Sequence, residues 1–201
     1  MSQDNIKNGS SSRSKKPDPW LEQFEQFVVE FKGETDRAAV ILGAAKLDYI
    51  LYQILQKYLI PNVGSRDELL EGDSPLSSFS SKINICYRLG LIDAEFTRAL
   101  HLIRKIRNAF AHEVSGCRLD SGAHRDRARE LAAPFINTRG YKLIQEAYFE
   151  DKVGPSAEFF IILASAVISL DDVFKEITPL NAKEATMLYT SPWNEHAETE
   201  A

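Results

Sequence analysis

The chain has few cysteines. Cys86 and Cys117 are the two among 201 residues, and no CxxC pair occurs. The usual signatures of a disulfide scaffold or a zinc site are therefore missing, and a reducing cytoplasm is the natural setting. The four histidines are scattered, without an HExxH motif or a clustered carboxylate, so we expect no bound metal and no other cofactor.

A targeting or membrane segment is also missing from the sequence pattern. The first sixteen residues are polar and rich in Ser and Asn, unlike a secretory signal peptide. The most apolar stretch, from Phe159 to Leu170, is bounded by Glu158 and Asp171. Crossing a bilayer takes about 20 apolar residues, so we expect this stretch to form the central buried helix of the core. The expected location is cytoplasmic, with no membrane partner.

An excess of positive charge is the third absence. The chain carries 24 Lys and Arg against 29 Asp and Glu, a formal net charge of -5. No domain-wide basic field is available to attract nucleic acid, and no convincing helix-turn-helix occurs. Direct, sequence-specific DNA binding is therefore not expected, although a local basic patch stays open.

What the sequence does contain is helical periodicity along most of its length. Hydrophobic residues make up 44% of the chain, as in globular proteins. Their spacing predicts helices over roughly residues 20–32, 39–58, 79–89, 93–111, 125–133 and 157–177. Helical spacing is weaker between residues 135 and 155, and no alternating strand pattern of useful length occurs. These observations predict an all-α fold.

The expected architecture is a single compact helical bundle of antiparallel neighbours. We expect this domain to span residues 19–180, with flexible polar tails at 1–18 and 181–201. The segments 62–78 and 115–124 are predicted as loops. His124 would then lie in a loop and His101 on the exposed side of its helix, and neither is assigned a role.

The candidate functional cluster is a run of six residues from Arg107 to His112, at the end of the helix expected over 93–111. Asn108 and His112 share a helix face, while Arg107 points partly away but has a long, flexible side chain. An arginine that binds oxyanions, an amide that orients and a histidine that titrates near neutrality suit a phosphate site. The alternative is a structural cluster in which Arg107 pairs with Asp36 or Asp48.

Four further residues are candidates for binding. Asp36 and Arg37 begin a helix, where they either line a cleft or complement the helix dipole. Asp48 lies among apolar residues of the same helix and would suit a neighbouring arginine. Arg104 lies about one helical turn before Arg107, the first residue of the cluster.

Four blocks of the chain resemble the mannitol operon repressor family. In order, they run from Glu34 to Val40, Gly72 to Ser80, Tyr87 to Ile92 and Ile103 to His112. The resemblance covers about residues 34–112 and implies an all-helical bacterial regulator associated with repression of a sugar-alcohol uptake operon. We expect such a regulator to be a homodimer. Because the chain is acidic and has no convincing helix-turn-helix, we expect it to act by binding another protein.

The last block also resembles the helical HEPN superfamily, many of whose members are metal-independent ribonucleases. Arg107, Asn108 and His112 match the order of its signature. The resemblance implies that two protomers would bring their motifs together on RNA. His112 would then serve as general base or acid, Arg107 would stabilise charge on phosphorus, and Asn108 would orient the phosphate or the histidine. An endoribonuclease is therefore the alternative function.

Overall fold

The computed structural model describes residues 19–113, 116–150 and 153–181. Within these ranges the regular structure is helical, with no strand, which confirms the predicted all-α fold. The helices are α1 (Pro19–Gly33), α2 (Asp36–Tyr58), α3 (Phe79–Arg88), α4 (Ala94–His112), α5 (Gly122–Ala132), α6 (Arg139–Tyr148) and α7 (Pro155–Glu176). The tails expected at 1–18 and from 182 onward lie outside the described residues.

Contacts divide the chain into two units, Met1–Gly33 and Glu34–Ala201. α1 belongs to the first unit, and α2 to α7 belong to the second. All residues of the candidate site lie in the second unit. The domain limits expected from the sequence stay a prediction.

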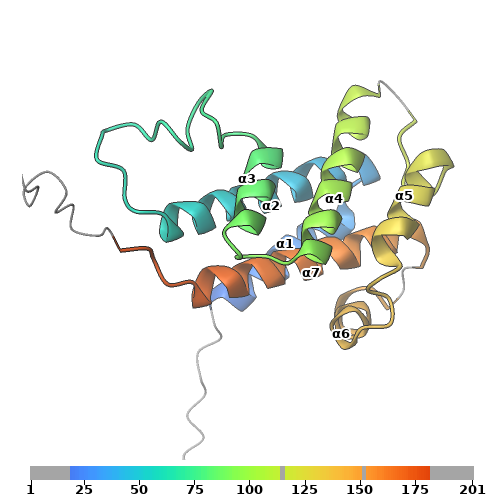
Figure 1. Cartoon of the computed structure of the whole chain (residues 1–201). Helices are drawn as coiled ribbons and strands as arrows, with labels where there is room; N and C mark the ends of the chain where they lie inside the picture. The colour runs from blue at the N-terminus through green and yellow to red at the C-terminus, as the bar shows by residue number, and fades with distance from the viewer. Residues whose placement is uncertain (1–18, 114–115, 151–152, 182–201) are drawn as a thin grey trace, which may run out of the picture. The chain divides into compact units, whose positions relative to one another are not determined.

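The centre of the second unit is the pair α2 and α7, which pack against each other and run parallel (Figure 1). At their N-terminal ends, Asp36 Oδ2 lies 3.2 Å from Ser156 Oγ. At their C-terminal ends, the Lys57 ammonium lies 4.7 Å from the centroid of the Phe174 ring. The expectation that neighbouring helices are antiparallel is wrong for this pair. Four helices separate the two in sequence, so no short connection forces them to reverse direction.

α2 is long because its apolar residues keep a helical period over its whole length. Thr35 caps its first turn by accepting a hydrogen bond from the Ala38 amide. Length and hydropathy would allow this helix to cross a membrane, but half of that apolar window is buried inside the molecule. Leu47, Leu51 and Leu55 are among its fully buried residues. We therefore interpret α2 as a core helix, contacting α3, α4 and α7.

α3 and α4 form a hairpin that lies across α2 and α7 (Figure 1). Ser78 caps α3, and Asp93 caps α4 through a 2.7 Å hydrogen bond from the Phe96 amide. Between them, Gly90 has a φ of 72°, a left-handed conformation that glycine adopts without steric cost. After this turn, α4 buries one face, on which Leu100, Ile103 and Ile106 are fully covered.

α5 begins at Gly122, so the expectation of a loop through His124 is wrong. His124 lies in the first turn of the helix and is only 8% exposed. The sequence did not indicate the start of α5 for two reasons. The Ser121 side chain makes no capping hydrogen bond, and the first buried apolar residues of the helix come late, at Ala128 and Leu131. α6 occupies the segment in which helical spacing was weak.

A buried lysine joins α3 to α2. Lys82 is 6% exposed, and its ammonium lies 2.8 Å from the Asp48 carboxylate and 5.9 Å from the centroid of the Tyr52 ring. The Asp48 side chain is 28% exposed, so water reaches one partner of the pair. Removing the carboxylate would leave a buried cation without its counter-ion.

We expect Asp48→Asn to lower the free energy of unfolding by about 2 to 3 kcal/mol, because it isolates the Lys82 charge. Lys82→Met leaves the carboxylate near water and fills the space with an apolar side chain, so it should change stability by less than about 1 kcal/mol. Urea denaturation of both variants beside the wild type measures the difference. Equal losses in the two variants would contradict this account.

Candidate functional site

The cluster from Arg107 to His112 forms the last turns of α4. Phe110 is fully buried, so the face of α4 that carries it packs against the core. Arg107 and Asn108 are half-buried, and His112, the last helical residue, is exposed. Arg107 Nη1 donates a 3.1 Å hydrogen bond to Asn108 Oδ1. The polar groups of the cluster therefore lie at the surface, and the amide orients the guanidinium.

The structural alternative expected for Arg107 is wrong in its partners. Asp36 Oδ2 accepts hydrogen bonds from the Leu119 amide at 2.8 Å and from Ser156 Oγ at 3.2 Å. Asp48 pairs with Lys82. Both carboxylates are thus engaged with residues other than Arg107. Asp36 joins the start of α2 to the start of α7 and to the segment that leads into α5.

Arg37 binds the chain where it leaves α4. Its guanidinium donates to the Glu113 carbonyl and lies 3.2 Å from Cys117 Sγ. Asp36 and Arg37 are therefore neighbours in sequence that hold the same connecting segment, one through Leu119 and the other through Glu113. Their observed contacts are internal, and a role in binding a partner stays a prediction.

Three side chains to which the sequence assigns no role meet beside this segment: Glu113, Cys117 and His124. Cys117 Sγ donates a 2.9 Å hydrogen bond to Glu113 Oε2, and His124 Nε2 lies 2.9 Å from Glu113 Oε1. The His124 ring is held edge-on against Phe110, with 4.6 Å between ring centroids. Glu113 and Cys117 are four residues apart in the chain. Because the sequence predicted a loop around His124, it did not indicate that His124 lies close to both.

Hydrogen bonding shifts the acid–base properties of this cluster. The hydrogen bond from Cys117, and then that from His124, lower the pKa of Glu113. Burial raises the pKa of the Cys117 thiol, and its hydrogen bond to Glu113 raises it further. The carboxylate is therefore the charged acceptor, and the thiol is the donor. The second cysteine, Cys86, is fully covered, and burial raises its pKa to about 12.

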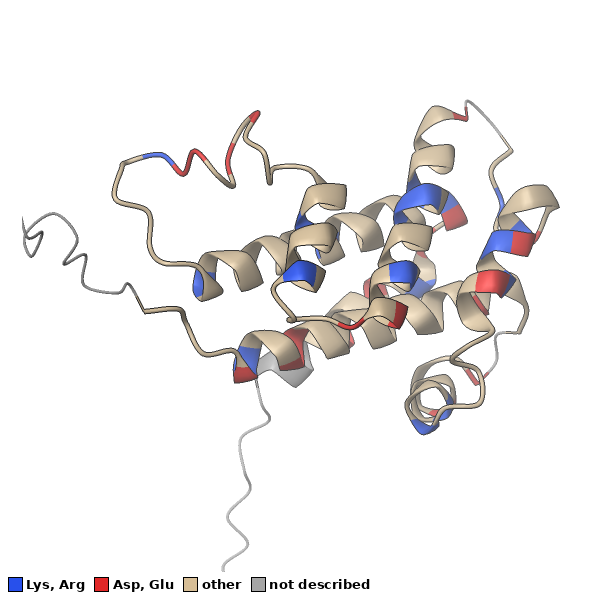
Figure 2. Ribbon diagram, viewed as in Figure 1, with Lys and Arg blue, Asp and Glu red and all other residues tan. Residues whose placement is uncertain are grey.

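One face of α4 is polar and basic along its length. Its residues recur at spacings of three and four, so they share one side of the helix: Arg98, His101, Lys105, Asn108 and His112. Figure 2 shows basic residues along α4 and in α5. Arg104, beside this face, is half-buried, and its Nε is covered without a hydrogen-bond partner among the described residues. An acidic chain thus carries a local basic surface.

The sequence predicted His101 on the exposed side of its helix. In the structure its side chain is half-buried in this face. Its Nε2 lies 2.9 Å from Asn84 Oδ1, which connects α4 to α3. Burial lowers the pKa of His101, and the charges of Arg104 and Lys105 lower it further. The neutral imidazole is therefore the form that the fold favours.

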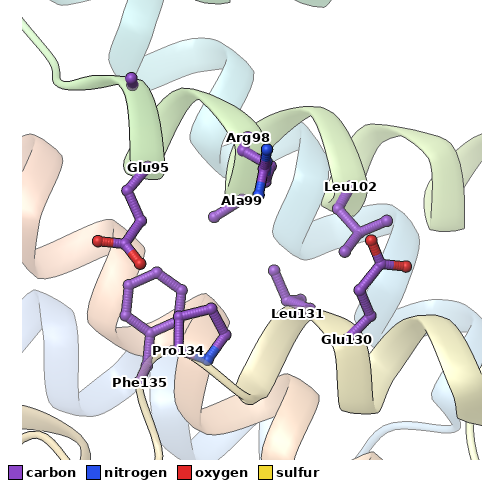
Figure 3. A pocket seen from close by; sticks show the side chains of 9 residues that line it. Glu95, Arg98, Ala99, Leu102, Glu130, Leu131, Pro134 and Phe135 are labelled. Carbon is purple, nitrogen blue, oxygen red and sulfur yellow. The ribbon is translucent and has the colours of Figure 1, made fainter.

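Two cavities lie along the N-terminal half of α4, away from the Arg107 to His112 cluster. The first, of about 340 Å³, is lined by α4 and by the end of α5, with Glu95, Arg98, Glu130 and Phe135 around it (Figure 3). The second, of about 400 Å³, lies among α4, α6 and α7 and is mainly apolar. Phe135 lines both, so the two form adjoining parts of one surface.

Comparison with known proteins adds information about the fold. No protein-family model matches the chain, and no curated protein matches it. A chain in the X-ray structure of the MtlR–HPr complex from Escherichia coli is similar in structure, with a TM-score of 0.54 and 18% sequence identity. The match covers 74% of this chain and 98% of that chain. The two proteins share a helical fold.

Asp36→Asn should lower the free energy of unfolding by about 1 to 2 kcal/mol, because the amide of the fully buried Leu119 loses a charged acceptor. Ser156→Ala removes only the longer of the two hydrogen bonds, so the expected loss is about 0.5 kcal/mol. Thermal unfolding of both variants at one pH provides the comparison. A larger effect from the serine than from the aspartate would show that Asp36 does not hold the segment.

The pH dependence of stability should reveal His101. Its pKa is lower in the folded than in the unfolded chain, so this stability is present above the unfolded pKa and is lost as the pH falls toward the folded pKa. Between about pH 7.5 and 5.5, the Tm of the wild type should therefore fall more than that of His101→Gln. Glutamine keeps a hydrogen bond to Asn84 but takes up no proton. Identical slopes would contradict the assignment.

Proposed function

We propose that the chain is a regulatory protein of the mannitol operon repressor type that acts by binding another protein. The observation that carries the proposal is the fold shared with a chain of the MtlR–HPr complex, because nearly the whole of that chain is matched. The four sequence blocks that resemble the family point the same way. A protein partner also suits the net charge of -5, which disfavours a long nucleic-acid groove.

The surface that best suits a protein partner is the one around Phe135. It combines an apolar cavity with a cavity rimmed by Glu95, Arg98 and Glu130, and interfaces commonly pair an apolar centre with a polar rim. Leu143, on α6, lines the apolar cavity and is 53% exposed. A partner that covers this side chain would remove apolar area from water.

The first partner to test is HPr, because the structurally similar protein is in a complex with it. Isothermal titration of HPr into the purified full chain should show saturable binding. Leu143→Asp should weaken that binding at least about tenfold, which requires a loss of about 1.4 kcal/mol, because it places a charge in the apolar centre. Leu42→Asp, on α2 and 54% exposed, is the matched control and should bind as the wild type does.

Two results would replace this proposal. One is tight, sequence-specific binding of DNA by the purified protein alone, measured by gel shift at physiological salt. The other is cleavage of RNA in the presence of a chelator that is lost in folded Arg107→Ala and His112→Ala variants. No contact among the described residues favours the nuclease over protein binding, so the nuclease stays an alternative for this assay to decide.

A further inference from the structure

Glu113, Cys117 and His124 bring three different metal-binding atoms together. The carboxylate oxygen, the thiol sulfur and the imidazole nitrogen all lie within 4.8 Å of one another. Oxygen, sulfur and nitrogen donors of this kind are the ligands of zinc, which takes three protein ligands and an open fourth position in its non-structural sites. The cluster is separate from the surface around Phe135.

The fold already holds two of these donors in position. His124 is 8% exposed and packed edge-on against Phe110, so its ring has little freedom to rotate. Its Nε2 faces Glu113, while its Nδ1 is covered without a hydrogen-bond partner among the described residues. Glu113 is the C-cap residue of α4, where its backbone amide bonds to the Ala109 carbonyl. Pre-positioned donors lower the ordering cost of binding a ligand.

Arg37 supplies an independent reason for the sulfur to be a ligand. Its guanidinium lies 3.2 Å from Cys117 Sγ and also holds the Glu113 carbonyl. A cation that donates to a thiolate stabilises its negative charge, as outer hydrogen bonds commonly do for metal ligands. The same contact limits how far Cys117 can move from Glu113.

We propose that Glu113, Cys117 and His124 bind one zinc ion, or a divalent ion of similar chemistry, between the end of α4 and the start of α5. Tetrahedral zinc with bonds of about 2.0 to 2.3 Å places neighbouring donors roughly 3.3 to 3.7 Å apart. The two 2.9 Å separations must therefore widen by under about 1 Å, which the 47% exposed Glu113 side chain allows. The fourth ligand is water, on the exposed side of Glu113.

Proton transfer accompanies binding. Cys117 loses its thiol proton to solvent as the metal–sulfur bond forms. His124 binds the metal through the Nε2 lone pair, which places the ring proton on Nδ1. Glu113 exchanges its hydrogen bonds with both residues for a metal–oxygen bond. The ion would thereby join α4, α5 and the segment between them.

The test uses the full chain, reduced and freed of metal with a chelator, and then titrated with Co²⁺ as a probe. Cobalt bound by a thiolate in a tetrahedral site absorbs visible light and shows a sulfur charge-transfer band. One equivalent should produce both signals, and Zn²⁺ should displace the cobalt. In Cys117→Ala the charge-transfer band should disappear, and in Glu113→Gln the affinity should fall at least about tenfold.

Two matched variants keep the result specific. Cys86→Ala removes the other cysteine, and His101→Gln removes a half-buried histidine outside the cluster; both should retain the wild-type cobalt spectrum. Circular dichroism verifies that each variant is folded, and Cys117 and Glu113 are accessible enough for replacement without loss of the core. A wild type that gives no charge-transfer band, or a Cys117→Ala variant that keeps it, overturns the proposal.

Discussion

The parallel packing of α2 against α7 is the constraint on which the second unit depends. These helices contribute many of its fully buried side chains, including Leu47, Leu51, Phe159 and Leu163. Each such side chain stabilises the fold by about 1.5 to 3 kcal/mol through burial. The pairing also places both N-termini together, where Asp36 can reach Ser156. The same carboxylate accepts a hydrogen bond from the Leu119 amide, in the segment before α5.

The candidate site follows from this alignment. Because Asp36 and Arg37 lie at the start of α2, they meet the chain as it passes from α4 to α5. That segment then presents Glu113 and Cys117 to His124, on the first turn of α5. The polar ends of four elements are thus joined by hydrogen bonds whose donors and acceptors are mostly paired, as partly buried polar groups require.

The charge distribution separates two surfaces with different chemistry. The basic face of α4 belongs to an acidic chain. The surface around Phe135 is mainly apolar and carries a rim of both charge signs. A protein partner can use both surfaces, because electrostatic attraction accelerates encounter while apolar burial holds the complex.

The sequence by itself determined the helices whose apolar residues are periodic. α2, α3, α4 and α7 were predicted close to their observed bounds, because periodicity, capping residues and prolines are local signals. The same signals located the Arg107 to His112 cluster at the end of α4. Local signals carry no information on which helices pair or in which direction, so the parallel packing of α2 and α7 was not predicted. Only the tertiary structure gave Asp36 and Asp48 their partners, because those contacts join residues far apart in the chain. His124 is just 11 residues from Glu113, but the two meet because α5 begins before its apolar spacing becomes visible, at a start that only the folded chain reveals.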